Sequence, residues 1–175
     1  MSRQRPGSTK GVSSEASDVY KSKDQRLADV PHSEWRRSRA AAENIIPTTT
    51  GAAKAVGKVL PELKGKLDGI AMRVPVPDGP VVDSVFRLGK DVTVDDINEA
   101  VLTASQSNGM SNVVEYSTLP VVSTDIIGNP HSSIFDAPFT KVVQGNMVKT
   151  LNWYDNEWGY SNRVVDLLGI LDRLD

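Results

Sequence analysis

The sequence predicts an α+β fold, in which a mostly antiparallel sheet has helices on one face. Apolar and polar residues alternate over several short stretches, as in strands with one buried face. Other stretches place apolar residues three and four positions apart, as in a helix that packs along one side. These stretches rarely follow the strand–helix–strand order of parallel sheets. The predicted strands cover residues 69–76, 81–88, 113–116 and 147–154.

Three helices are predicted from their starts and their periodicity. A small-residue helix follows the threonines at 48–50 and stops at Pro61, because proline lacks the N–H that a helix needs. A second helix begins after Thr93, whose spacing from Asp96 is that of a capping box, and it ends near 108–109. Beyond Gly159, helical spacing predicts a C-terminal helix. Its apolar positions are Val164, Leu167, Leu168, Ile170, Leu171 and Leu174.

Length and composition restrict the classes of function. The chain has 175 residues, enough for one domain with a core, and a net charge of −2 does not favour a general nucleic-acid binder. Without cysteine, the chain can form no disulfide and can supply neither a catalytic thiolate nor a cysteine ligand to a metal. We predict no metal site. No apolar run reaches a membrane span and no secretion signal is evident, so we expect a cytoplasmic protein.

The first 23 residues differ from the rest of the chain. They are rich in Ser, Arg, Lys and Gly and have few apolar side chains, so we expect them to be disordered. The following loop, residues 24–47, contains Arg36, Arg37 and Arg39, but no aromatic platform for nucleic acid accompanies them beyond Trp35. His131 precedes two serines, yet nothing else in the sequence supports a catalytic triad, so we expect a structural loop histidine.

The residues indicate one candidate anion site. The helix after Thr50 and Gly51 begins with free N–H groups and the positive end of the helix dipole, which attract anions. Arg73 alternates with the apolar residues of its strand, and it can bind a phosphate through two hydrogen bonds if it lies beside that helix. Capping alone would also explain the threonines.

The most distinctive stretch is 151–163, with the sequence LNWYDNEWGYSNR. It closely resembles the C-terminal end of glyceraldehyde-3-phosphate dehydrogenases. The stretches 47–60 (PTTTGAAKAVGKVL) and 69–76 (GIAMRVPV) also match that family, and the resemblance extends over residues 24–175. We therefore predict an incomplete catalytic domain of this family over 24–175, following a non-matching tail over 1–23.

The resemblance implies a set of roles. Thr50, Gly51 and Arg73 would bind inorganic phosphate or a substrate phosphate. Asn156 would contact the nicotinamide carboxamide of NAD or NADP, and Tyr160 would lie nearby. Residues 24–47 would form the long S-shaped loop that packs against neighbouring subunits of a tetramer. The reaction implied is the oxidation of glyceraldehyde 3-phosphate, with phosphate and NAD(P), to 1,3-bisphosphoglycerate.

Two features of the family are missing from the sequence. The chain contains no Gly-x-Gly turn for a dinucleotide, and it has neither the cysteine that attacks the aldehyde nor a histidine near Val19, where the family alignment expects one. We therefore assign no catalytic residue and expect neither activity nor tight cofactor binding from this chain alone. Three hypotheses stay open: a catalytic-domain portion separated by truncation or a frame error, a pseudoenzyme that binds intact subunits, and a simple phosphate-binding domain.

Overall fold

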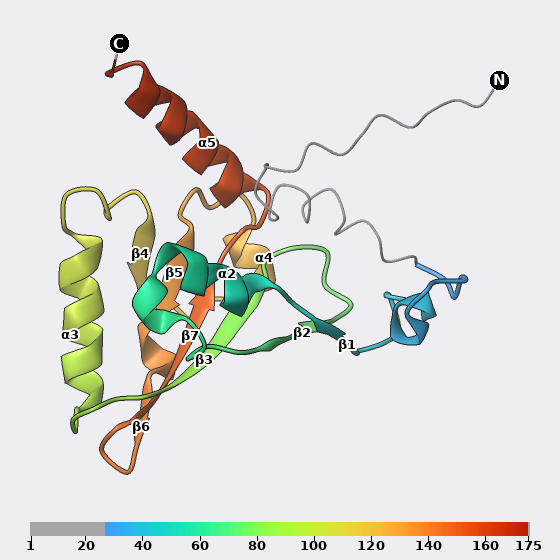
Figure 1. The fold of residues 1–175 in the computed structure, drawn as a ribbon, viewed down its shortest axis with the longest axis horizontal. Helices are drawn as coiled ribbons and strands as arrows, with labels where there is room; N and C mark the ends of the chain where they lie inside the picture. The colour runs from blue at the N-terminus through green and yellow to red at the C-terminus, as the bar shows by residue number, and fades with distance from the viewer. Residues whose placement is uncertain (1–26, 175) are drawn as a thin grey trace. The chain divides into compact units, whose positions relative to one another are not determined.

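The computed structural model describes residues 27–174, which form two compact units (Figure 1). The first runs to Val76 and the second begins at Pro77; we call them the N-terminal unit and the C-terminal unit. Residues 1–23, for which disorder is predicted, lie outside the described residues. The assignment of 24–175 as an incomplete catalytic domain stays a prediction.

The N-terminal unit is built on a two-stranded antiparallel ribbon. Its strands are β1 (Ile46–Thr49) and β2 (Ile70–Arg73), with Ile46 opposite Arg73 and Thr49 opposite Ile70. The ribbon is linked by α2 (Ala52–Val59) and the 3-10 turn η3 (Pro61–Leu63). The helix therefore starts directly after the threonines and ends just before Pro61, as predicted. The preceding loop contains the short η2 (Trp35–Ser38).

A five-stranded sheet forms the C-terminal unit. The strands are β3 (Val81–Arg87), β4 (Val114–Ser117), β5 (Ser133–Asp136), β6 (Lys141–Val143) and β7 (Met147–Trp153). They follow the order β3-β7-β5-β4, and β6 pairs with the first part of β7. All pairings are antiparallel except β4 with β5, so the mostly antiparallel sheet is confirmed.

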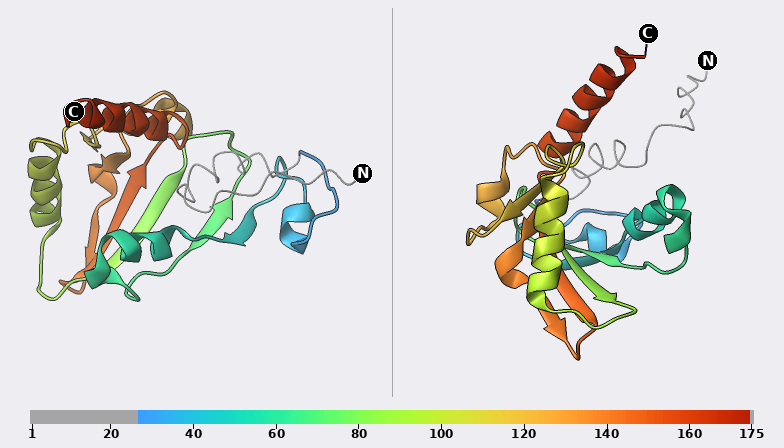
Figure 2. Two further views of the ribbon diagram at one scale, coloured as in Figure 1. Left: turned by 45° about the horizontal axis from the view of Figure 1, so that its top comes forward. Right: turned by 90° about the vertical axis from the view of Figure 1, so that its left-hand side faces the viewer.

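One face of this sheet packs against α3 (Val94–Ser105), which lies beside β4 (Figure 2). The capping box is present: Thr93 Oγ1 accepts the Asp96 N–H at 3.1 Å, and the Thr93 N–H donates to the Asp96 carboxylate at 2.8 Å. Asn98 ties the helix to the sheet by accepting the Thr140 hydroxyl at 2.7 Å. Phe135 and Val148 are buried on this face.

The C-terminal helix α5 (Trp158–Leu171) follows β7 after a short turn, as the sequence predicts. Its apolar side chains from Val164 onwards are largely exposed. One short helix, α4 (Ser123–Ile126), was not predicted, because a single turn is too short to show helical periodicity. Within residues 27–174, no helix is long and apolar enough to cross a membrane.

Candidate functional site

The start of α2 has the features of an anion-binding helix terminus. The first N–H groups of a helix have no partner inside the helix, and Thr50 Oγ1 satisfies one of them by accepting the Ala52 N–H at 3.2 Å. The first turn contains no acidic residue that would compete with an anion. Nothing lies within 4 Å of the position that a side chain on Gly51 would take, so the backbone there faces open space.

Arg73 lies at the other end of the same ribbon. It is paired with Ile46, four residues before Thr50, which corresponds to about 13 Å between the two Cα atoms along the strand. The register therefore places Arg73 and the start of α2 at opposite ends of the ribbon.

The buried face of β2 differs from the one that the sequence predicts. Arg73 does point away from Ile70 and Met72, as the alternation predicts, but those apolar residues are exposed and Arg73 is half-buried. The register explains this, because Arg73 shares its face with Ile46 and Thr48, the buried residues of β1. Arg73 is therefore more constrained than a solvated surface arginine.

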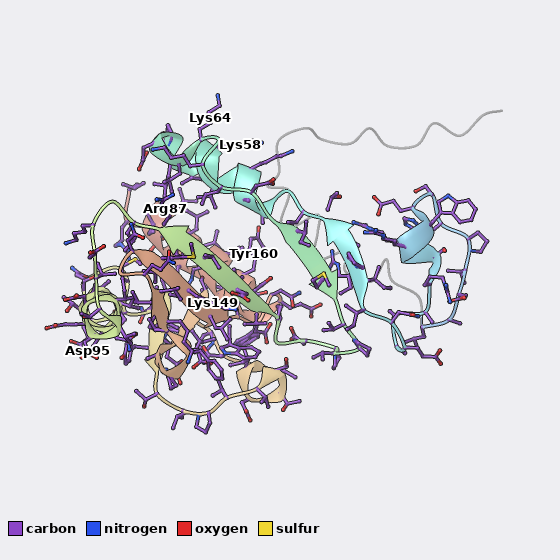
Figure 3. The ribbon with its side chains drawn as sticks, turned by 90° about the horizontal axis from the view of Figure 1, so that it is seen from below. Lys58, Lys64, Arg87, Asp95, Lys149 and Tyr160 are labelled. Atoms are coloured by element: carbon purple, nitrogen blue, oxygen red, sulfur yellow. The ribbon has the colours of Figure 1, made fainter. Side chains whose placement is uncertain are left out.

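The two cofactor candidates lie where β7 passes into α5. Asn156 is in the turn. Tyr160, which Figure 3 labels, is in the first turn of α5. Nearby asparagines use their amides structurally: Asn152 donates to Ser133 at 2.9 Å, and Asn162 donates to the Trp158 carbonyl at 2.8 Å. Within the described residues, the Asn156 side chain makes no hydrogen bond, so its amide is available to pair with a ligand amide.

A single buried carboxylate holds this turn. Asp155, which is 4 % exposed, accepts backbone N–H groups from Glu157 at 2.9 Å and Trp158 at 2.7 Å through Oδ1. Its Oδ2 accepts the Gly128 N–H at 2.8 Å. Asp155 thus caps α5 and joins it to the loop before β5. Burial opposes the charge on this carboxyl, but the three N–H donors outweigh it and hold the pKa of Asp155 below its usual value.

The same loop is pressed against the start of α5. A Cβ atom on Gly159 would lie 3.0 Å from the carbonyl oxygen of His131, so only glycine fits without a shift. Asn129 Oδ1 accepts the His131 N–H at 2.9 Å, and Glu115 lies 3.2 Å from His131 Nδ1. His131 is therefore bound to an amide and a carboxylate, and among residues 27–174 its ring makes no hydrogen bond to a serine hydroxyl.

Asp78 adds a second carboxyl at this junction, and sequence reasoning missed it. It accepts the Gly79 N–H at 2.7 Å. Burial, followed by the nearby charges of Asp155 and Glu157, raises the pKa of Asp78. Its local sequence, Pro-Asp-Gly, predicts only a turn. Within residues 27–174, no group of His, Asp and Glu is arranged to hold a metal ion.

The two units define an α+β protein, with an open, acid-free helix start in one unit and an asparagine amide on the turn before α5 in the other. The chain matches the family model described as "Glyceraldehyde 3-phosphate dehydrogenase, C-terminal domain" over residues 19–156. It belongs to that family. The match begins five residues before Asp24, the start predicted from the sequence, and ends at Asn156.

Individual relatives agree with this assignment. The chain is 59 % identical over 144 residues to a glyceraldehyde-3-phosphate dehydrogenase of Priestia megaterium and 58 % identical over 144 residues to one of Streptomyces coelicolor, in each case covering 82 % of this chain and 43 % of the relative. It is 53 % identical over 150 residues to one of Mycolicibacterium smegmatis, covering 86 % and 44 %. The chain thus spans less than half the length of these relatives.

Proposed function

We propose that this chain supplies the phosphate-binding and nicotinamide-contacting parts of a phosphorylating glyceraldehyde-3-phosphate dehydrogenase. The observation that supports it best is the open, acid-free start of α2 at Thr50 and Gly51, on a ribbon that also presents Arg73, in a chain of this family. Guanidinium and backbone N–H groups are the donors that bind phosphate oxygens. In this proposal, Thr50, Gly51 and Arg73 hold either the attacking phosphate or the phosphate of the substrate.

The second part of the proposal concerns the cofactor. NAD or NADP, when bound, accepts the hydride that leaves the aldehyde carbon. A primary amide is both donor and acceptor, so the free side chain of Asn156 fits the nicotinamide carboxamide, with Tyr160 close by on α5. Asn156 would orient the ring. The residues of this chain fit only that end of the cofactor, because its sequence has no Gly-x-Gly turn to approach the pyrophosphate.

The reaction also needs a thiolate. Its sulfur adds to the aldehyde, hydride leaves to give a thioester, and a phosphate oxygen then displaces the sulfur to give the acyl phosphate. None of the 175 residues is a cysteine. We therefore propose that this chain alone does not turn over, and that it acts only together with residues from elsewhere.

The alternative role is association with like subunits, and the exposed valines on one face of the sheet support it. On the face opposite α3, Val81 and Val85 of β3 lie beside the β7 residues that they pair with, and Val143 of β6 extends the same face. These valines are exposed, and the Asp83–Lys149 ion pair lies among them on the same face. Exposed apolar residues with polar neighbours of this kind mark an interaction surface. A non-catalytic module that binds intact dehydrogenase subunits would use this face.

Phosphate-dependent stabilisation tests the binding site. We expect phosphate to raise the Tm of the chain more than chloride at equal ionic strength, and we expect Arg73→Ala to remove the difference. Arg87→Ala, which removes an exposed arginine at the end of β3, is the matched control and should keep it. Equal effects of phosphate and chloride on the wild-type chain would contradict the proposed site.

A mixing experiment separates the two roles. If this chain is incubated with an intact dehydrogenase such as the Priestia megaterium relative, mixed oligomers without a change in activity favour the interaction module. Absence of any mixed species argues against that role and leaves the phosphate site as the function to be tested.

A further inference from the structure

The outer edge of β3 carries a row of backbone groups without partners. In the sheet order β3-β7-β5-β4, β3 is the terminal strand and pairs with β7 alone. The Leu88 N–H donates to the Asn146 carbonyl at 2.8 Å, and the Tyr154 N–H donates to the Pro80 carbonyl at 3.2 Å. The even-numbered residues of β3 therefore turn their N–H and C=O groups toward β7, because these groups alternate in direction along an antiparallel strand.

The odd-numbered residues of β3 are Val81, Asp83, Val85 and Arg87, and their N–H and C=O groups point away from the sheet. Among residues 27–174, no hydrogen bond reaches these backbone groups. All four residues are exposed, and the strand runs for 7 residues without a proline. A long, exposed edge of this kind pairs readily with a further strand.

The charges along this edge are self-complementary. Asp83 and Arg87 flank Val85 at equal spacing, and their three side chains share a face because alternate residues of a strand do so. If two copies of β3 align antiparallel about Val85, each Asp83 lies opposite an Arg87, and the two valines lie opposite each other. This register brings odd-numbered residues together on both strands, so each facing pair can exchange two N–H···O bonds.

Other registers that pair the outward groups are less favourable. An antiparallel pairing centred on Ser84 sets Asp83 opposite Val85 and Val81 opposite Arg87, so it forms no ion pair. A pairing centred on Asp83 places two carboxylates opposite each other, and like charges in that position are destabilising. The charge pattern therefore favours the register centred on Val85.

Both charged groups can take part in such a pairing. Asp83 Oδ2 lies 2.9 Å from Lys149 Nζ, but both side chains are about half exposed, so this surface pair leaves the carboxylate open to a second cation. Arg87, which Figure 3 labels, is exposed and makes no ion pair among residues 27–174.

We propose that the outer edge of β3 is a pairing site for a second copy of this chain, whose own β3 adds antiparallel about Val85 and joins the two sheets into one. The inference does not rest on the proposed function, which uses the start of α2, Arg73 and Asn156. It also differs from packing of the exposed valine face, because the two copies are held by backbone hydrogen bonds at an edge.

Amide hydrogen exchange, measured by NMR on the full chain over a range of concentrations, tests the inference. The N–H groups of Asp83, Val85 and Arg87 point outward, whereas those of Ser84 and Phe86 point toward β7. We expect the outward amides to exchange rapidly in dilute solution and to gain at least about tenfold protection as the chain associates. The two inward amides should be protected at every concentration. Packing between sheet faces would give the outward amides no such gain.

Disulfide trapping tests the register, since the chain contains no cysteine and one introduced thiol reports a single position. Val85→Cys places the two sulfur atoms next to each other at the centre of the pairing, so mild oxidation should link two copies. Val81→Cys is the matched control, because Val81 is also exposed and belongs to the outward set. In this register the two control thiols lie about 26 Å apart along the strands, and they should link at least about tenfold more slowly.

A charge exchange tests the ion pairs. Arg87→Asp sets two carboxylates opposite each other at both ends of the register, and it should weaken association at least about tenfold in sedimentation experiments. The double variant Asp83→Arg/Arg87→Asp restores opposite charges and should recover most of this loss. Lys64→Asp is the matched control, because it changes the net charge equally at an exposed residue of the N-terminal unit, and it should associate as the wild type does.

Three outcomes would overturn the inference. Outward amides whose protection does not change with concentration would mean that the edge is either covered within a single chain or never paired. Equal rates of linking for Val81→Cys and Val85→Cys would exclude the register. A double variant that associates as weakly as Arg87→Asp would exclude the ion pairs. None of these measurements uses phosphate or cofactor, so a failed phosphate test would leave the result unaffected.

Discussion

The indole N–H of Trp153 donates to Oδ2 of Asp136 at 2.9 Å, across the pairing of β7 with β5. Asp136 is 1 % exposed, and within the described residues its Oδ1 has no hydrogen-bond partner. Trp153→Phe would leave this buried carboxylate without its indole donor. We expect the free energy of unfolding to fall by about 1–3 kcal/mol, measured by urea denaturation.

A double-mutant cycle provides the control. In the Asp136→Asn background the charge is gone, so Trp153→Phe should cost clearly less than it does in the wild type. Equal costs in both backgrounds would mean that the loss comes from ring packing and not from the hydrogen bond.

Gly159 and Gly169 lie in the same helix and should respond oppositely to alanine. At Gly159 the new methyl group would meet the His131 carbonyl at 3.0 Å, and that backbone is held in place because its N–H donates to Asn129. We expect Gly159→Ala to destabilise the chain despite the higher helix propensity of alanine. At Gly169 nothing lies within 4 Å, so Gly169→Ala should stabilise it by up to about 1 kcal/mol.

Thermal unfolding of both variants checks this prediction. A Gly159→Ala variant as stable as Gly169→Ala would show that the loop at 128–132 yields easily, and that α5 is not pressed against it.

Acid should weaken the turn through Asp155. Because the pKa of Asp155 is lowered in the folded chain, its contribution to stability is present above the ordinary aspartate pKa and is lost as pH falls through the folded value. Asp155→Asn cannot accept all three N–H groups, so we expect a loss of about 1.5–3 kcal/mol at neutral pH. Its stability should then decrease less on acidification than that of the wild type. Urea unfolding at several pH values measures both, and parallel pH profiles would contradict the prediction.

Local patterns predicted the elements better than their connections. Alternation identified β3 and β7 nearly to the residue, and Thr93 with Asp96 fixed the start of α3, because both signals act within a few residues. The parallel pairing of β4 with β5 could not be predicted, since no local signal specifies which strands pair.

Sequence patterns likewise predicted some residues of the candidate site and missed others. Asn156, Thr50 and Arg73 were predicted from stretches that resemble a known family. Asp78 was not predicted, because its turn sequence carries no signal of Asp155, far along the chain, whose charge helps to raise the pKa of Asp78. The buried face of β2 was also unpredictable, since burial there depends on which side of the ribbon β1 covers with Ile46 and Thr48.

The open face of the sheet should drive association between copies of the chain. Val85 is 61 % exposed in the middle of β3, on the face that α3 does not cover. It pairs with Lys149, which Figure 3 labels. We expect the wild-type chain to associate increasingly with concentration in sedimentation experiments.

Val85→Asp would place a charge in that interface and should weaken association at least about tenfold, which corresponds to about 1.4 kcal/mol. Val94→Asp is the control, since a carboxylate is favourable at the start of α3, and it should associate normally. A wild-type chain that stays monomeric at high concentration would refute the prediction, as would a Val85→Asp variant that associates like the control.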